Sequence, residues 1–245
     1  MIPKTLHYCW FGRGEKPAPV LACIDSWKKY LPDYQIMEWN EDNFDFESYP
    51  YAKEAYECRK FAFVSDVARL HALYTTGGVY MDTDFEVLKP LDPFMEDEGF
   101  MGFERDGFVA TCILAGSPHC TWAKTLLDRY SQLHFIQEDG SYDLTTNVVR
   151  VTEYLLERGL RPDGSRQKLP GIGTIYPRDF FSPLHPLTGR MTITPNTVAI
   201  HHLEGSWKEK PSLAVRFRKW VMYHFGEQAY YKLRSLKLKV FPKPW

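Results

Sequence analysis

The sequence is organised around one stretch, Thr75-Thr76-Gly77-Gly78-Val79-Tyr80-Met81-Asp82-Thr83-Asp84. A Gly-Gly turn leads into a short apolar run, and two carboxylates one residue apart follow it. Because alternate side chains of a strand share a face, an extended run points Asp82 and Asp84 the same way, where they repel unless a cation neutralises them. Mg²⁺ and Mn²⁺ prefer such oxygen ligands and share them with substrate phosphates. The pair therefore indicates a metal site, with a chance Asp-x-Asp triplet in a solvated turn as the alternative.

The segments around this stretch predict an α/β fold. A strand over residues 4–11, a helix over 19–30 and a second strand over 34–39 make a βαβ opening, which implies a parallel sheet. The segment 52–74 lacks Pro and Gly and predicts one long helix that the Gly-Gly pair ends. Further strands are expected over 79–81, 85–91, 99–103, 108–115 and 192–202, further helices over 117–133 and 147–158, and mostly loop over 161–192.

Composition places the chain among globular proteins and excludes a disordered one. Of its 245 residues, 44% are hydrophobic and 25% are charged. The net charge of -1 hides an asymmetry, because residues 211–245 hold eight Lys and Arg against one acid, Glu227. We expect a catalytic domain over 1–210 and a basic aromatic helical tail over 211–245. The tail either packs on the body or lies on an anionic membrane surface.

The cysteines and the N-terminal residues indicate in which cellular compartment the protein is expected. Five scattered cysteines without a Cys-x-x-Cys pair predict free thiols in a reducing cytosol. No signal peptide is expected, since Met1–Lys4 runs directly into a strand-like segment, and no apolar run approaches the roughly 20 residues of a membrane span. We expect a cytoplasmic protein, attached peripherally to the inner face of the membrane if its tail binds lipid.

Three other places hold candidate functional residues. Asp66 and Arg69 share a face of the long helix, as a surface ion pair or, because the helix ends near the Asp pair, as part of its site. The run from His201 to Lys208 combines possible metal ligands with a lysine suited to phosphate, although its histidines also fit an ordinary turn. Trp10 follows the first strand, where ligands of open α/β sheets bind, and either stacks on a base or belongs to the core.

Together these pieces resemble glycosyltransferase family 32, the group with a DXD sugar-binding region that is related to yeast initiating mannosyltransferases and clostridial glucosylating toxins. The resemblance covers most of residues 1–95 and 170–210, and residues 96–170 match poorly. It rests on Ile2-Pro3-Lys4-x-x-His7-x-x-Trp10, Ser26-Trp27, Pro32-x-Tyr34, Trp39-Asn40, Ala62-x-x-Ser65-Asp66-x-x-Arg69, Gly77-Gly78-Val79-Tyr80-x-Asp82-x-Asp84 and the His201-to-Trp207 run.

The resemblance implies a GT-A fold, with a Rossmann-like mixed sheet that binds a nucleotide-sugar. Asp66 and Arg69 then hold the sugar, Asp82 contacts ribose or metal, and Asp84 binds Mn²⁺ or Mg²⁺. The catalytic set is therefore Asp66, Arg69, Asp82 and Asp84, with metal ligands among Asp82, Asp84, His202 and Glu204. The donor-binding set is Trp10 on the base, Tyr80 in the donor pocket, Asn147 on the sugar, and Ser206, Trp207 and Lys208 on the phosphates. Asn147 stands in Thr145-Thr146-Asn147, where relatives often carry a Thr-Gly-Pro-like turn.

The expected function is a metal-dependent, retaining transfer of a hexose to a saccharide or lipid-linked oligosaccharide acceptor. Capsular, exopolysaccharide or lipopolysaccharide-type assembly is the expected setting. UDP-galactose is the first choice of donor, with GDP-mannose and a UDP-N-acetylhexosamine as alternatives, and no nucleic acid partner is expected. Two other classes remain open: a Mg²⁺-dependent phosphohydrolase, and a non-catalytic carbohydrate- or membrane-binding protein.

Overall fold

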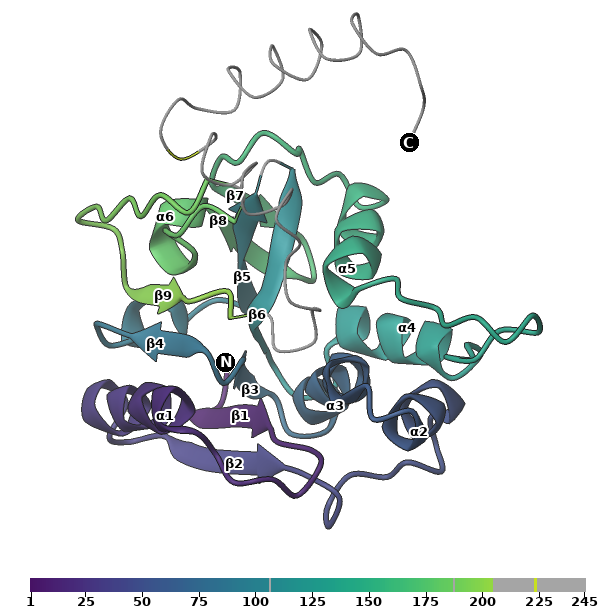
Figure 1. The fold of residues 1–245 in the computed structure, drawn as a ribbon. Coiled ribbons are helices and arrows are strands. Elements are labelled where there is room, and N and C mark those ends of the chain that lie inside the picture. The colour runs from purple at the N-terminus through teal and green to yellow at the C-terminus, as the bar shows by residue number, and fades with distance from the viewer. Residues whose placement is uncertain (106, 187, 205–222, 224–245) are drawn as a thin grey trace, which may run out of the picture.

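A computed structural model describes residues 1–105, 107–186, 188–204 and 223. Its main sheet has seven strands in the order β2-β1-β3-β6-β5-β8-β7 (Figure 1). β1 is parallel to β2 and β3, β5 is parallel to β8, and β6 runs antiparallel between β3 and β5. The strands are β1 (Thr5–Cys9), β2 (Gln35–Trp39), β3 (Gly78–Met81), β5 (Gly99–Arg105), β6 (Phe108–Gly116), β7 (Gln167–Leu169) and β8 (Gly173–Tyr176).

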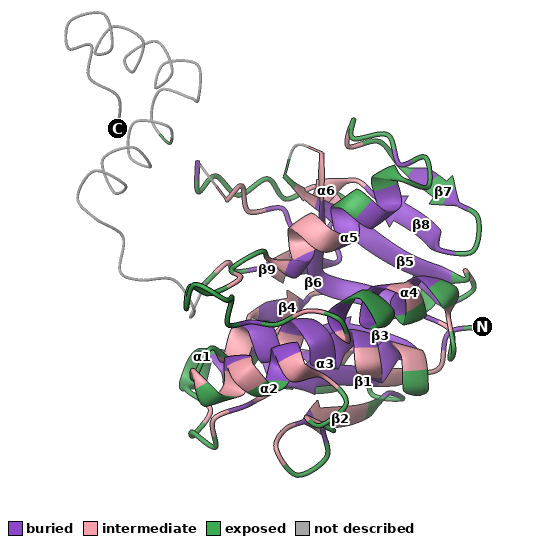
Figure 2. Ribbon diagram, turned by 90° about the vertical axis from the view of Figure 1, so that its right-hand side faces the viewer, coloured by how far each residue is buried: buried purple, intermediate pink, exposed green. Residues whose placement is uncertain are grey.

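Helices and a second small sheet cover the two faces of the main sheet. A hydrophobic core lies on each face of the main sheet. Successive side chains of β3 point to opposite faces, so Val79 and Met81 pack into one core and Tyr80 packs into the other. One core lies under α2 (Pro50–Glu57), α3 (Phe61–Thr75), α4 (Thr121–Tyr130) and α5 (Asn147–Leu156). The other lies under α1 (Ala18–Tyr30), the 3₁₀ turn Asp92–Phe94, α6 (Arg178–Phe181) and the pair β4 (Phe85–Val87) and β9 (Ala199–His201). Figure 2 shows the buried residues concentrated in the strands and on the inner sides of the helices.

The mixed α/β fold and the parallel β1-α1-β2 opening predicted from the sequence are confirmed. The single helix predicted over 52–74 is wrong, because the chain breaks between α2 and α3. Arg59 adopts a left-handed conformation with φ 55, and the Lys60 amide donates to the carbonyl of Ala55. The left-handed conformation is unfavourable for an arginine by itself, so tertiary packing must cause this break in the helix. The sequence did not predict the break, because the segment contains no Gly or Pro.

Two other predictions about the chain's later part are also corrected. The segment 161–192 holds β7, β8 and α6 where mostly loop was expected, because Thr174 and Ile175 pair with β5 inside the sheet. The last predicted strand shrinks from 192–202 to Ala199–His201, the length that β4 can pair. All five cysteines are free, as predicted. None of the described helices is long and apolar enough to cross a bilayer. The predicted tail over 211–245 lies outside the described residues, apart from Tyr223.

The Gly-Gly turn is fixed by the first strand. Gly77 and Gly78 have φ values of +67 and +112, a region that side chains disfavour. The Gly77 carbonyl accepts a 2.8 Å hydrogen bond from His7 Nε2, while His7 Nδ1 accepts one of 3.1 Å from Trp39. This arrangement makes the His7 ring neutral, and its burial lowers its pKa. The hydrogen bond from His7 therefore ties the Gly-Gly turn to β1 directly before β3 begins.

Gly78→Ala is expected to destabilise the protein by about 3 kcal/mol, since it combines backbone strain with a steric clash. A Cβ at Gly78 lies 2.3 Å from the Thr5 carbonyl oxygen, a backbone atom that cannot move aside. Gly164→Ala is the matched control, because Gly164 has φ +73 but no atom within 4 Å of the added Cβ. Urea unfolding of the two variants measures the difference, and equal losses of stability would contradict the steric argument.

Candidate active site

A buried arginine on α3 connects the helix to the Asp pair. Arg69 lies 3.0 Å from an Asp66 oxygen and 3.3 Å from Asp82 Oδ1, and it donates a 2.7 Å hydrogen bond to the Thr111 carbonyl. The side chains of Arg69 and Asp66 are 6% and 11% exposed, which excludes the surface ion pair considered from the sequence. A buried cation between two carboxylates allows both to stay inside the protein. Burial still raises the pKa of Asp66 to about 6, although Arg69 opposes the rise.

Asp82 leaves β3 at its carboxyl end. Its Oδ1 accepts a 2.8 Å hydrogen bond from Tyr80, whose ring lies 4.6 Å from the Arg69 guanidinium. The Asp82 amide donates to Cys112 on β6, and its carbonyl accepts from Phe85, so the chain turns here. The predicted extended Asp82–Asp84 run is therefore wrong, because a turn separates β3 from β4. Burial raises the pKa of Asp82, with Arg69 acting in the opposite direction.

The short β4–β9 sheet brings the end of the described chain to the Asp pair. Phe85 pairs with His201, which places His201 Nε2 3.4 Å from Asp84 Oδ1. The Glu204 amide donates a 3.0 Å hydrogen bond to Asp84 Oδ2. Burial favours a higher pKa for Asp84, but the hydrogen bond and charge of His201 outweigh it, and the Asp84 pKa is lowered. Asp84 is thus held as a carboxylate.

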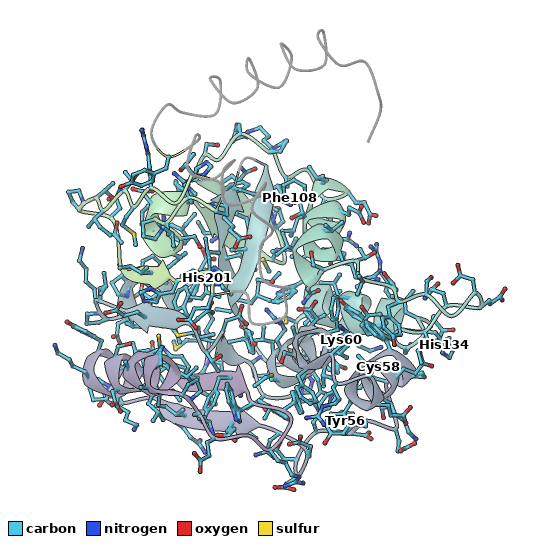
Figure 3. The ribbon with its side chains drawn as sticks, viewed as in Figure 1. Tyr56, Cys58, Lys60, Phe108, His134 and His201 are labelled. Carbon is cyan, nitrogen blue, oxygen red and sulfur yellow. The ribbon has the colours of Figure 1, made fainter. Side chains whose placement is uncertain are left out.

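Among the described residues, Asp82, Asp84 and His201 form a group whose ligand atoms lie within 4.8 Å of one another. Two carboxylate oxygens and an imidazole nitrogen are a donor set that suits Mn²⁺ or Mg²⁺. Figure 3 shows His201 on β9. Sequence reasoning placed His201 in the relevant run but did not single it out. The signal that identifies it is its pairing opposite Phe85, which no local pattern reveals.

The ring of His202 is placed differently from that of His201. His202 Nε2 lies 3.0 Å from Glu86 Oε2, and the His202 amide donates to the Asp84 carbonyl. Glu204 contacts Asp84 through its backbone, with an exposed side chain. The structure therefore groups His201 with the Asp pair, while metal binding by His202 and Glu204 stays a prediction.

A second carboxylate faces the other nitrogen of the His201 ring. Glu104 Oε1, on β5, lies 3.4 Å from His201 Nδ1, and the Glu104 side chain is 15% exposed. His201 Nδ1 is buried and has no hydrogen-bond partner among the described residues, and Glu104 Oε1 is a carboxylate oxygen within 3.4 Å of it. Burial works against a charged His201, but Cys112, Asp84 and Glu104 favour it and raise its pKa. Sequence reasoning missed Glu104.

Glu104→Gln is expected to weaken Mn²⁺ binding by about tenfold. A histidine ligand commonly donates its second ring N–H to a carboxylate, and losing that acceptor costs tenfold or more in metal affinity. The affinity is measured by Mn²⁺ titration followed by electron paramagnetic resonance. Glu153→Gln, an exposed change on α5, is the control. An affinity equal to that of the unmodified protein would show that Glu104 does not orient His201.

Asn147 begins α5 and supports Asp66. The Asn147 amide donates a 3.0 Å hydrogen bond to Asp66 Oδ2, and its side-chain nitrogen donates one of 3.0 Å to the Asp66 carbonyl. Tyr130 donates to its side-chain oxygen at 3.4 Å. These contacts bring Asn147 into the site from the poorly matching middle of the sequence. Its predicted contact with the sugar remains a prediction.

Trp10 lies just past β1, the strand next to β3. Its Nε1 donates a 2.6 Å hydrogen bond to the Gly14 carbonyl, and Lys16 Nζ lies 5.7 Å from its ring. The Trp10 side chain is half-buried. Trp10 and Asp82 thus follow neighbouring parallel strands at the same edge of the sheet, where ligands of such sheets bind. Ser206, Trp207 and Lys208 lie outside the described residues.

A mixed sheet with an Asp-x-Asp pair and a buried arginine at its strand ends is the arrangement that the resemblance to GT-A enzymes predicted from the sequence. Residues 17–101 match the family model described as "Glycosyltransferase sugar-binding region containing DXD motif". This match over residues 17–101 confirms the resemblance stated from the sequence. The phosphohydrolase and non-catalytic alternatives have no support from these matches.

Two curated relatives come from Schizosaccharomyces pombe. Inositol phosphoceramide mannosyltransferase 1 is 30% identical over 133 residues, which cover 45% of this chain and 39% of that protein. Inositol phosphoceramide mannosyltransferase 3 is 30% identical over 98 residues, covering 38% of this chain and 27% of that protein. This chain therefore spans less than half the length of either relative.

Among solved structures, the chain is similar to the one titled "PaToxG Glycosyltransferase". The TM-score is 0.51 at 18% sequence identity, and the alignment covers 64% of this chain and 68% of that one. At this identity the likeness shows the fold, and it confirms the GT-A type predicted from the sequence.

Proposed function

We propose that this protein is a metal-dependent, retaining glycosyltransferase that moves a hexose from a nucleotide-sugar to a saccharide acceptor. The observation that carries the proposal is the group Asp82, Asp84 and His201 beside the buried Asp66–Arg69 pair. The first group would hold a metal, which would supply positive charge to a diphosphate, and the second offers a carboxylate and a guanidinium to sugar hydroxyls. The two features adjoin, because Arg69 on α3 lies 3.3 Å from Asp82.

Contacts among the protein's own side chains fix the positions of the proposed site residues in the absence of a donor. Arg69 holds Asp66 and Asp82 at fixed positions, so their reorganisation on binding is small. Glu104 faces one nitrogen of His201 and leaves the other facing Asp84. In the proposed reaction the bond between the sugar and the diphosphate breaks, the acceptor oxygen bonds to the same carbon, and the departing phosphate takes the acceptor proton. Retention is proposed on the family resemblance, which places no protein nucleophile beneath the sugar.

Two donors are proposed, and one observation favours each. UDP-galactose follows from the resemblance to small bacterial transferases of polysaccharide assembly. GDP-mannose is the second candidate, since both curated relatives are named mannosyltransferases. A UDP-N-acetylhexosamine remains a weaker alternative, because it rests on the shared fold alone.

The proposed setting is capsular, exopolysaccharide or lipopolysaccharide-type assembly at the inner face of the cell membrane. Its support is the basic aromatic composition of residues 211–245. The names of the curated relatives also specify a lipid-linked acceptor, inositol phosphoceramide. We propose a membrane-facing role for the tail on these two grounds.

A donor panel tests the proposal. The protein is incubated with Mn²⁺ and, in turn, with UDP-galactose, UDP-glucose, UDP-N-acetylglucosamine, GDP-mannose and a simple, hydrolysable phosphate monoester. Slow release of one nucleoside diphosphate, lost on chelation with EDTA, is the expected result. The anomeric configuration of the transferred sugar, read by NMR, tests retention. Release of inorganic phosphate from the monoester, with every nucleotide-sugar intact, would overturn the proposal.

A further inference from the structure

The segment that joins α4 to α5 forms a projection, here called the arm and defined as residues 131–146 (Figure 1). Three large apolar side chains on it are exposed: Ile136 at 40%, Tyr142 at 44% and Leu144 at 57%. Exposed apolar residues are ordinary when they are scattered, but three within nine residues of one loop mark a contact surface.

The arm is anchored to the body at its base. Phe135 is fully buried, and the Tyr51 hydroxyl donates a 3.0 Å hydrogen bond to the Asp143 carbonyl. Glu54 on α2 accepts from the Ile136 amide at 3.0 Å and lies 2.5 Å from His134. Ile136 and Tyr142 pair as an isolated bridge across the arm. Its exposed side chains are therefore held in place by the body of the protein.

A shallow pocket lies at the base of the arm. Its volume is about 640 Å³, and its lining residues are Gln137, Tyr142, Asp143, Leu144, Thr145, Thr146 and Val149. The Tyr142 ring stacks on Phe135, with ring centroids 5.0 Å apart and an angle of 20° between the planes. One ring face thus packs against Phe135, and Tyr142 as a whole is 44% exposed. A fixed aromatic face of this kind accepts the C–H face of a sugar ring.

The charges of the pocket favour a neutral ligand. None of its described lining residues is Lys or Arg, and its one acid, Asp143, is paired with Arg150. A phosphate or carboxylate ligand has no unpaired cation to meet in this lining. The amide of Gln137 and the hydroxyls of Thr145 and Thr146 can instead exchange hydrogen bonds with neutral hydroxyl groups. Aromatic area with neutral hydrogen-bonding groups is the chemistry of a saccharide site.

The pocket also adjoins the candidate active site. Thr146 lines the pocket, and the next residue, Asn147, donates two hydrogen bonds to Asp66. The start of α5 therefore forms the wall between the pocket and the residues proposed to hold the donor sugar.

We propose that this pocket binds a neutral sugar unit of the acceptor, with Tyr142 as its stacking platform. The assignment rests on the proposed transferase function and names a specificity-determining residue for it. Because the acceptor must reach the donor sugar beside Asp66, a second unit bound in the pocket would orient its reacting hydroxyl.

Saturation-transfer NMR with the full-length protein tests the proposal directly. The probes are the methyl glycosides of galactose, glucose, mannose and N-acetylglucosamine, together with lactose. At least one probe is expected to bind the unmodified protein, with its affinity falling about tenfold in Tyr142→Ala. Tyr142→Phe retains the ring and is expected to bind as the unmodified protein does. Leu156→Ala, an equally exposed apolar site outside the pocket, is the surface control.

Several outcomes overturn the proposal without touching the transferase assignment. They are the absence of binding by every probe, equal binding in Tyr142→Ala, or equal losses in Tyr142→Ala and Leu156→Ala. Tyr142-dependent binding to neutral phosphatidylcholine vesicles, with no saccharide signal, would show that the arm contacts lipid. Donor hydrolysis in the absence of acceptor is measured beside these assays. It is expected to be unchanged in Leu156→Ala, and a lack of donor cleavage in both the unmodified protein and Leu156→Ala would count against the transferase proposal instead.

Discussion

Asp84→Asn is expected to lower Mn²⁺-dependent nucleotide binding by about 100-fold or more and to abolish transfer. Asparagine has the shape of aspartate and can still accept the hydrogen bond from the Glu204 amide, so the fold is retained. The change removes the carboxylate that the surrounding groups hold ionised, and with it the charge that attracts the cation. Isothermal titration of nucleoside diphosphate with and without Mn²⁺ gives the affinity.

Glu86→Gln is the matched control for this experiment. Glu86 is a neighbouring carboxylate that pairs with His202, and it lies outside the group formed by Asp82, Asp84 and His201. Metal-dependent binding is expected to survive in Glu86→Gln. Unchanged binding in Asp84→Asn, or an equal loss in both variants, would show that the metal site is assigned wrongly.

Arg69→Met is expected to destabilise the protein by about 4 kcal/mol, because it leaves two buried carboxylates without their shared cation. Asp66 and Asp82 both contact the guanidinium, and Thr111 loses a hydrogen bond as well. Arg69→Lys keeps the charge but loses the planar fork that reaches these groups together, so an intermediate loss is expected. The free energy of unfolding in urea measures both.

The surface pair Arg129–Glu157 supplies the control for Arg69. Arg129 is 43% exposed, and Arg129→Met is expected to leave the free energy of unfolding nearly unchanged. Adding Asp66→Asn to Arg69→Met is expected to restore part of the lost stability, because it removes one of the uncompensated charges. A loss in Arg69→Met no larger than that in Arg129→Met would contradict the buried network.

The sequence predicted the parts of the site that are close in the chain. Asp66, Arg69, Asp82 and Asp84 lie within nineteen consecutive residues, and helix and strand patterns place them near one another. It did not predict which histidine joins them, because that depends on the pairing of β4 with β9 across more than a hundred residues. Glu104 was missed for the same reason, since β5 reaches His201 only through tertiary packing.

Secondary structure failed where packing overrides local preference. The break at Arg59 uses a conformation that arginine does not favour by itself, and β7 and β8 occupy a segment dominated by turn formers. Short strands of three or four residues carry little periodic signal, and their partners decide whether they form. Asn147 was predicted only in part. The sequence identified it because it stands where relatives often carry a Thr-Gly-Pro-like turn, but only the structure shows its contacts with Asp66.

The pairing of β4 with β9 affects the order in which parts of the protein fold during synthesis. Asp84 and Glu204 are separated by 120 residues. During synthesis the nascent chain therefore exposes its acidic turn long before His201 leaves the ribosome, and the closure of so large a loop is entropically costly and slow. The catalytic edge is expected to be assembled last, on a sheet that is already formed. Chains that stall before residue 199 would carry the motif without its partner, so the proposed site is complete only after β9 has been synthesised.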